Sequence, residues 1–193
     1  MPTEIERKFL VNKRPADLRQ HAHAKIDQGY LCVTPEGEEV RLRRKGEACY
    51  LTVKRPKVSG LARTEVEVEI STTQFNALWP LTRGRRLQKT RYEVPINSLT
   101  IEVDVYGGTL KGLVVAEVEF ASVKQSRAFT PPTWFGDEVT ENTAYKNRNL
   151  AKLIESTGCS FMPTAMIRTN RIEQRLQRCR ATKKNDSFVT LNL

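Results

Sequence analysis

The sequence has few of the residues that build thiol- or imidazole-based metal sites. It holds four cysteines, none in a Cys-x-x-Cys pair, and only two histidines, His21 and His23, among 193 residues. Zinc sites are usually built from cysteine and histidine ligands at short, regular spacings. The scattered cysteines therefore argue against a zinc site, and they are typical of a reduced setting rather than of a disulfide framework.

Long apolar segments are also missing. No run approaches the roughly 20 apolar residues that a membrane helix needs. Charged residues begin at Glu4, which argues against a signal peptide at the start of the sequence. We therefore expect a cytoplasmic protein with no membrane association.

Positive charge, by contrast, is abundant. The formal net charge is +10 and the isoelectric point about 9.7, a balance that favours polyanionic partners. Residues 159–193 carry seven Lys or Arg against two acids. We expect one domain over residues 1–158, followed by a basic tail over residues 159–193. The tail is either solvated and disordered or a short amphipathic helix bearing Ile172, Leu176 and Cys179.

Strand patterns dominate the first 120 residues. Short segments rich in alternating apolar and charged residues are separated by turn residues such as Gly37 and Gly46. After a first strand from Glu4 to Val11, the pattern predicts strands at residues 27–34, 39–45, 48–55, 62–70, 85–95, 99–106 and 113–121. Mostly hairpin-connected strands with a few inserted helices predict an all-β-dominated fold, an eight-stranded antiparallel β-barrel with peripheral helices.

Three short helices are expected around these strands. Ser71 and Gln74 have the spacing of a capping box, as do Ser122 and Gln125. A last helix is expected over residues 143–157, with Leu150 on its apolar face and Gly158 as its stop.

The charged residues of the strands recur at every second position, so each set shares one face. They also segregate by sign from strand to strand, whereas an ordinary solvated face mixes both signs. The basic residues are Arg41 and Arg43, Lys54, which shares a face with Thr52 and Tyr50, and Lys89 and Arg91; the acidic pairs are Glu4 and Glu6, Glu65 and Glu67, Glu102 and Asp104, and Glu117 and Glu119.

A charged lumen is the arrangement that this segregation favours, with the apolar faces packed outward against the helices. Buried charges must be paired or must bind an ion. Basic side chains bind phosphate oxygens, and carboxylates hold hard cations such as Mg²⁺ or Mn²⁺. Phosphoryl transfer requires both elements.

Glu4-x-Glu6-x-Lys8, followed by the ordered charged pairs, resembles the signature of the CYTH, or triphosphate tunnel metalloenzyme, superfamily. The Tyr145-Lys146-Asn147 stretch is similar to the short bacterial inorganic triphosphatases of that superfamily, and the resemblance covers residues 1 to about 155. It implies an eight-stranded tunnel that binds a triphosphate together with a divalent metal, Mg²⁺ or Mn²⁺. It also makes a homodimer plausible.

The resemblance further implies roles for individual residues. The implied metal ligands are Glu4, Glu6, Glu65, Glu67, Asp104, Glu117 and Glu119. The implied substrate-binding residues are Lys8, Tyr30, Arg41, Arg43, Lys54, Lys89, Arg91 and Lys146. The implied catalytic residues are Lys8, Lys89, Glu102 and Asp104. For Tyr30, simple packing within a strand is an equal alternative.

The leading hypothesis for function is metal-dependent hydrolysis of inorganic triphosphate to pyrophosphate and phosphate. Adenylyl cyclase and thiamine triphosphatase activities are alternatives within the superfamily, although the few aromatic residues, 7% of the chain, offer no distinct purine-stacking cluster. A non-catalytic module that binds polyphosphate or RNA is an alternative of another class. The paired carboxylates argue against it, because they would repel an anion in the absence of metal.

Overall fold

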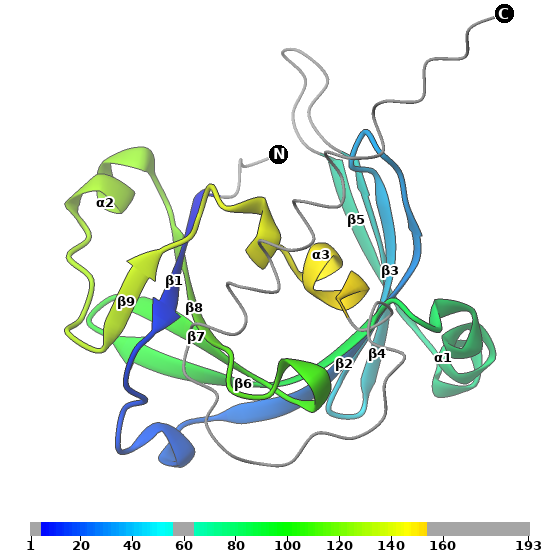
Figure 1. Cartoon of the computed structure of the whole chain (residues 1–193), viewed down its shortest axis with the longest axis horizontal. Coiled ribbons are helices and arrows are strands. Elements are labelled where there is room, and N and C mark those ends of the chain that lie inside the picture. Colours follow the sequence, from blue (N-terminus) through cyan, green and yellow to red (C-terminus); the bar gives the residue numbers. More distant parts are fainter. Residues whose placement is uncertain (1–4, 56–63, 154–193) are drawn as a thin grey trace, which may run out of the picture. The chain divides into compact units, whose positions relative to one another are not determined.

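The computed structural model describes residues 5–55 and 64–153. Nine antiparallel strands and a few short helices make up this part of the chain (Figure 1). The strands are β1 (Ile5–Val11), β2 (His23–Val33), β3 (Glu39–Lys45), β4 (Ala48–Arg55), β5 (Thr64–Ile70), β6 (Arg86–Ile96), β7 (Leu99–Tyr106), β8 (Val114–Phe120) and β9 (Phe135–Glu138). The helices are α1 (Thr72–Leu78), α2 (Val123–Ala128) and α3 (Asn147–Lys152), with 3₁₀ turns η1 (Leu18–Gln20), η2 (Trp79–Thr82), η3 (Gly108–Leu110) and η4 (Thr143–Tyr145).

All nine strands belong to one strongly curved sheet with the order β5-β4-β3-β2-β6-β7-β8-β1-β9 (Figure 1). The predicted antiparallel fold with few helices is thereby confirmed. Two details differ from the prediction. Nine strands are present rather than eight, and hydrogen bonds among the described residues leave β5 and β9 as the ends of the sheet, so it curves without closing.

The additional strand is β9, whose sequence FGDE has no apolar alternation. It forms because it pairs with β1 through Phe9↔Glu138 and Val11↔Phe135, on either side of an irregularity in register. Phe135 packs against Phe9 with ring centroids 4.8 Å apart. Tertiary pairing therefore produces a strand that local sequence does not indicate.

The helices follow their predicted caps with one exception. At α1 the capping box is complete, since Ser71 Oγ accepts from the Gln74 N–H and the Gln74 side chain accepts from the Ser71 N–H. At α2, Ser122 caps as predicted, but the Gln125 side chain accepts from the N–H of Ala121 instead. The predicted final helix starts as η4 and α3, and its expected stop at Gly158 lies outside the described residues.

Apolar side chains lie on the outer face of the sheet, as predicted. One cluster joins Phe9, Ile101 and Val118 on neighbouring strands to Phe129 and Trp134 beyond α2. A second cluster packs Phe75 of α1 against Leu42 and Cys49. Each fully buried large side chain contributes roughly 1.5–3 kcal/mol to stability, so these clusters hold α1 and the segment after α2 against the outer face.

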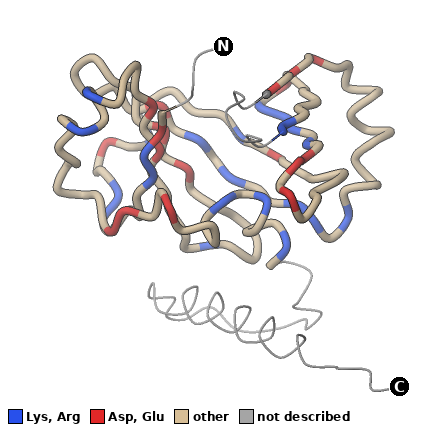
Figure 2. Tube along the Cα trace, turned by 90° about the horizontal axis from the view of Figure 1, so that it is seen from above, with Lys and Arg blue, Asp and Glu red and all other residues tan. Residues whose placement is uncertain are grey.

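Charged residues of both signs occur along the strands of the curved sheet (Figure 2). The described residues contain no helix that is long and apolar enough to cross a membrane. The expected basic tail, residues 159–193, lies outside the described residues, so the predicted domain boundary stays a prediction.

Candidate active site

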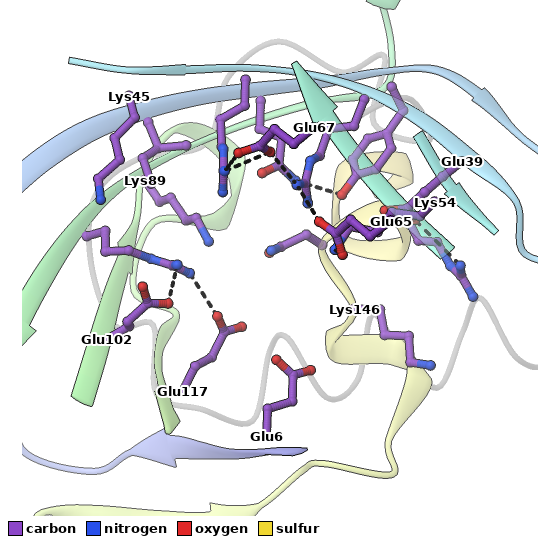
Figure 3. Close-up of a pocket in the computed structure, with 18 of the residues that line it drawn as sticks. Glu6, Glu39, Lys45, Lys54, Glu65, Glu67, Lys89, Glu102, Glu117 and Lys146 are labelled. Carbon is purple, nitrogen blue, oxygen red and sulfur yellow. Dashed lines mark hydrogen bonds and ion pairs between the residues drawn. The ribbon is translucent and has the colours of Figure 1, made fainter. Parts of the chain in front are cut away.

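A cavity of about 600 Å³ lies on the inner face of the sheet (Figure 3). Nine basic and seven acidic side chains are among the residues that line it. The charged faces of the strands therefore turn inward, as their segregation by strand predicted. The charged residues lining the cavity are Glu6, Lys8, Glu39, Arg41, Arg43, Lys45, Lys54, Glu65, Glu67, Lys89, Arg91, Glu102, Glu117, Glu119, Lys146 and Arg148.

On one wall, the basic residues of β3 and β4 are paired with the acids of β5. Lys54 Nζ lies 2.5 Å from Glu65 Oε2, and Arg43 Nη2 lies 2.8 Å from Glu67 Oε1. Strand register causes this pairing, since Lys54 is directly opposite Glu65 and Thr52 directly opposite Glu67. Both acids with an implied metal-binding role on β5 therefore face cations on this wall.

Glu67 is the most heavily bonded acid of that wall. Partial burial alone would raise the pKa of its carboxyl. The hydrogen bond from Thr52 Oγ1, at 2.6 Å, and the charges of Arg43 and Arg41 outweigh burial and lower the pKa below its ordinary value. Glu67 is therefore held as a carboxylate that orients the two arginines.

The opposite wall is organised around Arg91 of β6. Its guanidinium donates to both oxygens of Asp104, at 2.7 and 2.6 Å, to Glu117 at 2.8 Å and also to Glu102. Lys89 donates to Asp104 as well. Because β6 pairs with β7 and β7 with β8, Arg91 is opposite Asp104 and Glu102 is opposite Glu117. Adjacent strands thus bring three acids to one guanidinium.

Burial and charge shift several pKa values on this wall. Burial raises the pKa of Glu102, and the neighbouring charges of Glu117 and Asp104 add to the rise. Glu117 behaves oppositely, because the cations of Lys8, Lys89 and Arg91 outweigh its burial and lower its pKa. Burial is also the main reason that the pKa of Lys89 is lowered. The wall therefore holds one firmly ionised carboxylate beside one that protonates more easily.

Lys8 of β1 completes this wall. Its Nζ lies 2.8 Å from Glu117 Oε1, and Glu117 is its cross-strand partner on β8. Burial alone would lower the pKa of Lys8, but the charges of Glu117 and Glu6 raise it above its ordinary value. Lys8 thus remains a cation inside the cavity.

Helix α3 borders one end of the cavity (Figure 3). The Tyr106 hydroxyl donates to Asn147 Oδ1 at 2.5 Å. Arg148 Nη1 donates to the carbonyl of Gly37 at 3.0 Å and lies 3.5 Å from Glu39 Oε2. Helix α3 is therefore anchored both to β7 and to the turn before β3, and it brings Lys146 to the cavity.

Tyr30 lines the cavity but is only 1% exposed. Its hydroxyl accepts a hydrogen bond from Gln28 Nε2 at 2.7 Å. Burial and the nearby Glu39 carboxylate raise the pKa of the Tyr30 hydroxyl well above its ordinary value. Tyr30 therefore packs within the sheet and also lines the cavity, and its role in substrate binding stays a prediction.

Most residues with an implied role line this one cavity, with two exceptions. Asp104 does not line it, because its side chain is fully buried behind Lys89 and Arg91. Glu4 lies outside the described residues. The cavity also includes polar residues that were not predicted: Gln28, Glu39, Lys45, Asn147 and Arg148.

Two of these unpredicted residues, Glu39 and Lys45, could have been inferred from the sequence. Glu39 and Lys45 share the two-residue period of Arg41 and Arg43, so the alternation of β3 places them on the same face. Arg148 had no such signal, because its approach to Gly37 depends on where α3 packs.

The carboxylates of β1 and β8 are the residues best suited to hold a metal ion. Among the described residues, no three His, Cys, Asp or Glu side chains are gathered closely enough to hold one. Glu6 and Glu119 are nevertheless cross-strand partners that both line the cavity, and Glu117 follows on the same face. Their donor atoms are all oxygen, which is the chemistry that hard divalent cations require.

Comparison with known proteins gives a consistent result. The CYTH domain family matches residues 2–143. The inorganic triphosphatase of Nitrosomonas europaea is 48% identical over 151 residues, which is 77% of this chain and 97% of that protein. The inorganic triphosphatase of Acetivibrio thermocellus is 34% identical over 155 residues, which is 79% of this chain and 95% of that protein.

A solved structure is also similar. The crystal structure of the inorganic triphosphatase NE1496 superposes with a TM-score of 0.63 and 42% sequence identity, covering 79% of this chain and 96% of that one. The family match, the sequence identity and the fold all point to the same family. The chain is therefore a member of the CYTH domain family.

Proposed function

We propose that this protein is a metal-dependent inorganic triphosphatase, which hydrolyses tripolyphosphate to pyrophosphate and phosphate. The observation that carries the proposal is the cavity itself, in which nine basic side chains face seven acidic ones. A polyanion matches the basic residues, and a divalent cation matches the carboxylates. The relatives that cover most of this chain are named inorganic triphosphatases, which supports the same substrate.

The basic residues would divide between binding and reaction. Arg41, Arg43, Lys54 and Lys146 would bind the phosphate oxygens along the chain of the substrate. Lys8, Lys89 and Arg91 would surround the reacting phosphate and stabilise its developing negative charge. Ion pairs with acids hold six of these side chains in place, which reduces the reorganisation needed when substrate enters; the six are Lys8, Arg41, Arg43, Lys54, Lys89 and Arg91.

The carboxylates Glu6, Glu117 and Glu119, together with Glu4, would hold Mg²⁺ or Mn²⁺. When bound there, the cation supplies neutralisation of the charge on the phosphate oxygens. The implied ligands Glu65 and Glu67 belong instead to the ion pairs of β3–β5 in this arrangement, and we assign them to orienting Arg41, Arg43 and Lys54.

Hydrolysis itself forms one bond and breaks another. A water oxygen attacks the terminal phosphorus, the phosphoanhydride P–O bond breaks, and its electron pair leaves with pyrophosphate. We assign Glu102 as the base that takes the proton of the water, because its side chain is 30% exposed and lines the cavity. Asp104 suits this task less well, since both of its oxygens accept hydrogen bonds from Lys89 or Arg91 away from the cavity.

Phosphate release from tripolyphosphate, with and without Mg²⁺ or Mn²⁺, tests the proposal. We expect release that depends on metal and that exceeds release from ATP or thiamine triphosphate. Formation of cyclic AMP from ATP would instead establish the cyclase alternative. The cavity offers little for stacking an adenine base, because Tyr30 is the only aromatic residue among the described residues that line it. Binding of tripolyphosphate without metal and without turnover would favour the non-catalytic polyanion-binding module.

A further inference from the structure

The cavity has two different ends along strand β3. Its cavity-facing residues run from Glu39 through Arg41 and Arg43 to Lys45. At the Glu39 end, α3 is held by the bonds from Arg148 to Gly37 and from Tyr106 to Asn147. Among the described residues, α3 is the only helix that lines the cavity, so we take a longer linear substrate to project at the Lys45 end, away from α3.

At that end Lys45 is paired with an acid that the proposed mechanism does not use. Lys45 Nζ lies 3.0 Å from Glu93 Oε1, and the two side chains are 38% and 42% exposed. Glu93 stands two residues beyond Arg91 on β6, where it is directly opposite Glu102 of β7. The carboxylates of Glu93 and Glu102 are thus on directly paired positions at this end of the cavity.

We propose that Glu93 restricts the substrate to short phosphate chains by neutralising Lys45 at the end of the cavity away from α3. The proposal rests on the proposed function and makes it more specific, because it names the residue that separates tripolyphosphate from longer linear polyphosphates. Glu93 is a specificity-determining residue in this sense and not a catalytic one.

The physical argument is electrostatic. The cations from Lys54 to Arg91 along the cavity bind the three phosphates of tripolyphosphate in this proposal. A fourth phosphate extends toward Lys45, whose charge Glu93 already balances, and it meets the carboxylates of Glu93 and Glu102. The additional phosphate then loses hydration without gaining a cation in return. Discrimination against the longer ligand arises from repulsion, which is a common basis of specificity.

Glu93→Gln tests the proposal by removing one charge while keeping the size of the side chain. The measurement is kcat/KM for tetrapolyphosphate divided by kcat/KM for tripolyphosphate, from initial rates of phosphate release. We expect this ratio to rise by about twofold to fivefold, the range for one exposed ion pair. The rise should diminish at high salt, because salt screens exposed charges.

Glu138→Gln is the matched control. Glu138 is also paired with a cation, Arg7, at 2.7 Å, and its side chain is 40% exposed. It lies on β9 and does not line the cavity. We expect this control to leave the ratio unchanged, and an equal rise in both variants would overturn the proposal.

A second variant shows whether the effect acts through Lys45. Adding Lys45→Ala to Glu93→Gln removes the cation that the first change releases, so the ratio should return toward that of the unchanged protein. An unchanged ratio in Glu93→Gln, with tripolyphosphate still hydrolysed, overturns the proposal while leaving the proposed function intact.

If the unchanged protein releases no phosphate from tripolyphosphate, the proposed function fails. The role of Glu93 is then tested by measuring binding instead of hydrolysis. Isothermal titration calorimetry then compares Kd for the two polyphosphates. A lower Kd for tetrapolyphosphate relative to tripolyphosphate in Glu93→Gln supports the proposal, and an unchanged ratio of Kd values overturns it.

Discussion

Arg91 and Asp104 form a two-point ion pair in the wall of the cavity, with Arg91 Nε 2.7 Å from Asp104 Oδ1 and Arg91 Nη2 2.6 Å from Asp104 Oδ2. The carboxylate is fully buried, and Lys89 donates to it as well. One buried acid thus holds in place two cations that line the cavity, Lys89 and Arg91. Asp104 acts in our proposal as a positioning residue, not as a metal ligand.

Asp104→Asn should reduce the free energy of unfolding by about 3 kcal/mol or more, because removing one partner leaves buried cations without compensation. Urea denaturation followed by circular dichroism measures the change. Glu138→Gln serves as the control, since an exposed pair contributes at most about 1 kcal/mol. Equal free energies of unfolding for Asp104→Asn and the unchanged protein would show that the buried ion pair does not stabilise the fold.

Glu102→Gln should lower kcat for tripolyphosphate by about 10²- to 10⁴-fold, the range for losing a general base. KM should change much less, because the cations that bind phosphate remain. Steady-state phosphate release measures both constants. If kcat stays within a few-fold of the original value, another group must take the proton of the water. The role of Glu102 would then be limited to orienting Arg91.

Gly29→Ala should destabilise the protein by about 1–3 kcal/mol through overpacking. A Cβ at Gly29 would lie 2.6 Å from Oγ1 and 2.7 Å from Cβ of Thr82, a residue that is fully buried. Gly29 separates Gln28 and Tyr30, so the strain would reach the cavity. Thermal unfolding measures the loss. Gly107→Ala is the control, because its Cβ would meet nothing nearer than 3.7 Å, and a similar loss there would argue against the steric explanation.

Arg148→Ala should loosen the attachment of α3 at the end of the cavity. The change removes the hydrogen bond to Gly37 and the ion pair with Glu39. We expect faster amide hydrogen exchange in α3 and a higher KM for tripolyphosphate, with kcat less affected. Lys152→Ala, an exposed position of the same helix, is the control. Unchanged exchange in Arg148→Ala would mean that Tyr106 and Asn147 suffice to hold the helix.

Acid should weaken the attachment of β9 to β1. The hydrogen bond from Arg7 lowers the pKa of Glu138, and Thr140 contributes in the same direction. A lowered folded-state pKa stabilises the protein above the unfolded-state pKa, and the contribution is lost as pH falls through the folded-state value. The free energy of unfolding of Glu138→Gln should therefore vary less with pH in that acidic range. A parallel pH dependence in both proteins would contradict this prediction.

Much of the fold was predictable because the strands carry strong local signals. The hairpin of β3 and β4 was predicted with the observed bounds, and the capping box of α1 formed as Ser71 and Gln74 indicated. Strand β9 was missed because its four residues have no alternation and form only by pairing with β1. Closure of the barrel was expected, yet the sheet of the described residues has two ends.

The sequence by itself determined which side chains share a face, because the two-residue period of a strand is a local property. It thereby specified the charged inner surface on which Arg41, Lys89 and Glu117 meet. Tertiary structure alone decided their distances and exposure. Asp104 shares the period of Glu102 but is buried behind Lys89 and Arg91, and Arg148 reaches Gly37 only because α3 packs at that end. Burial and long-range contact depend on how the sheet curves, which no local pattern encodes.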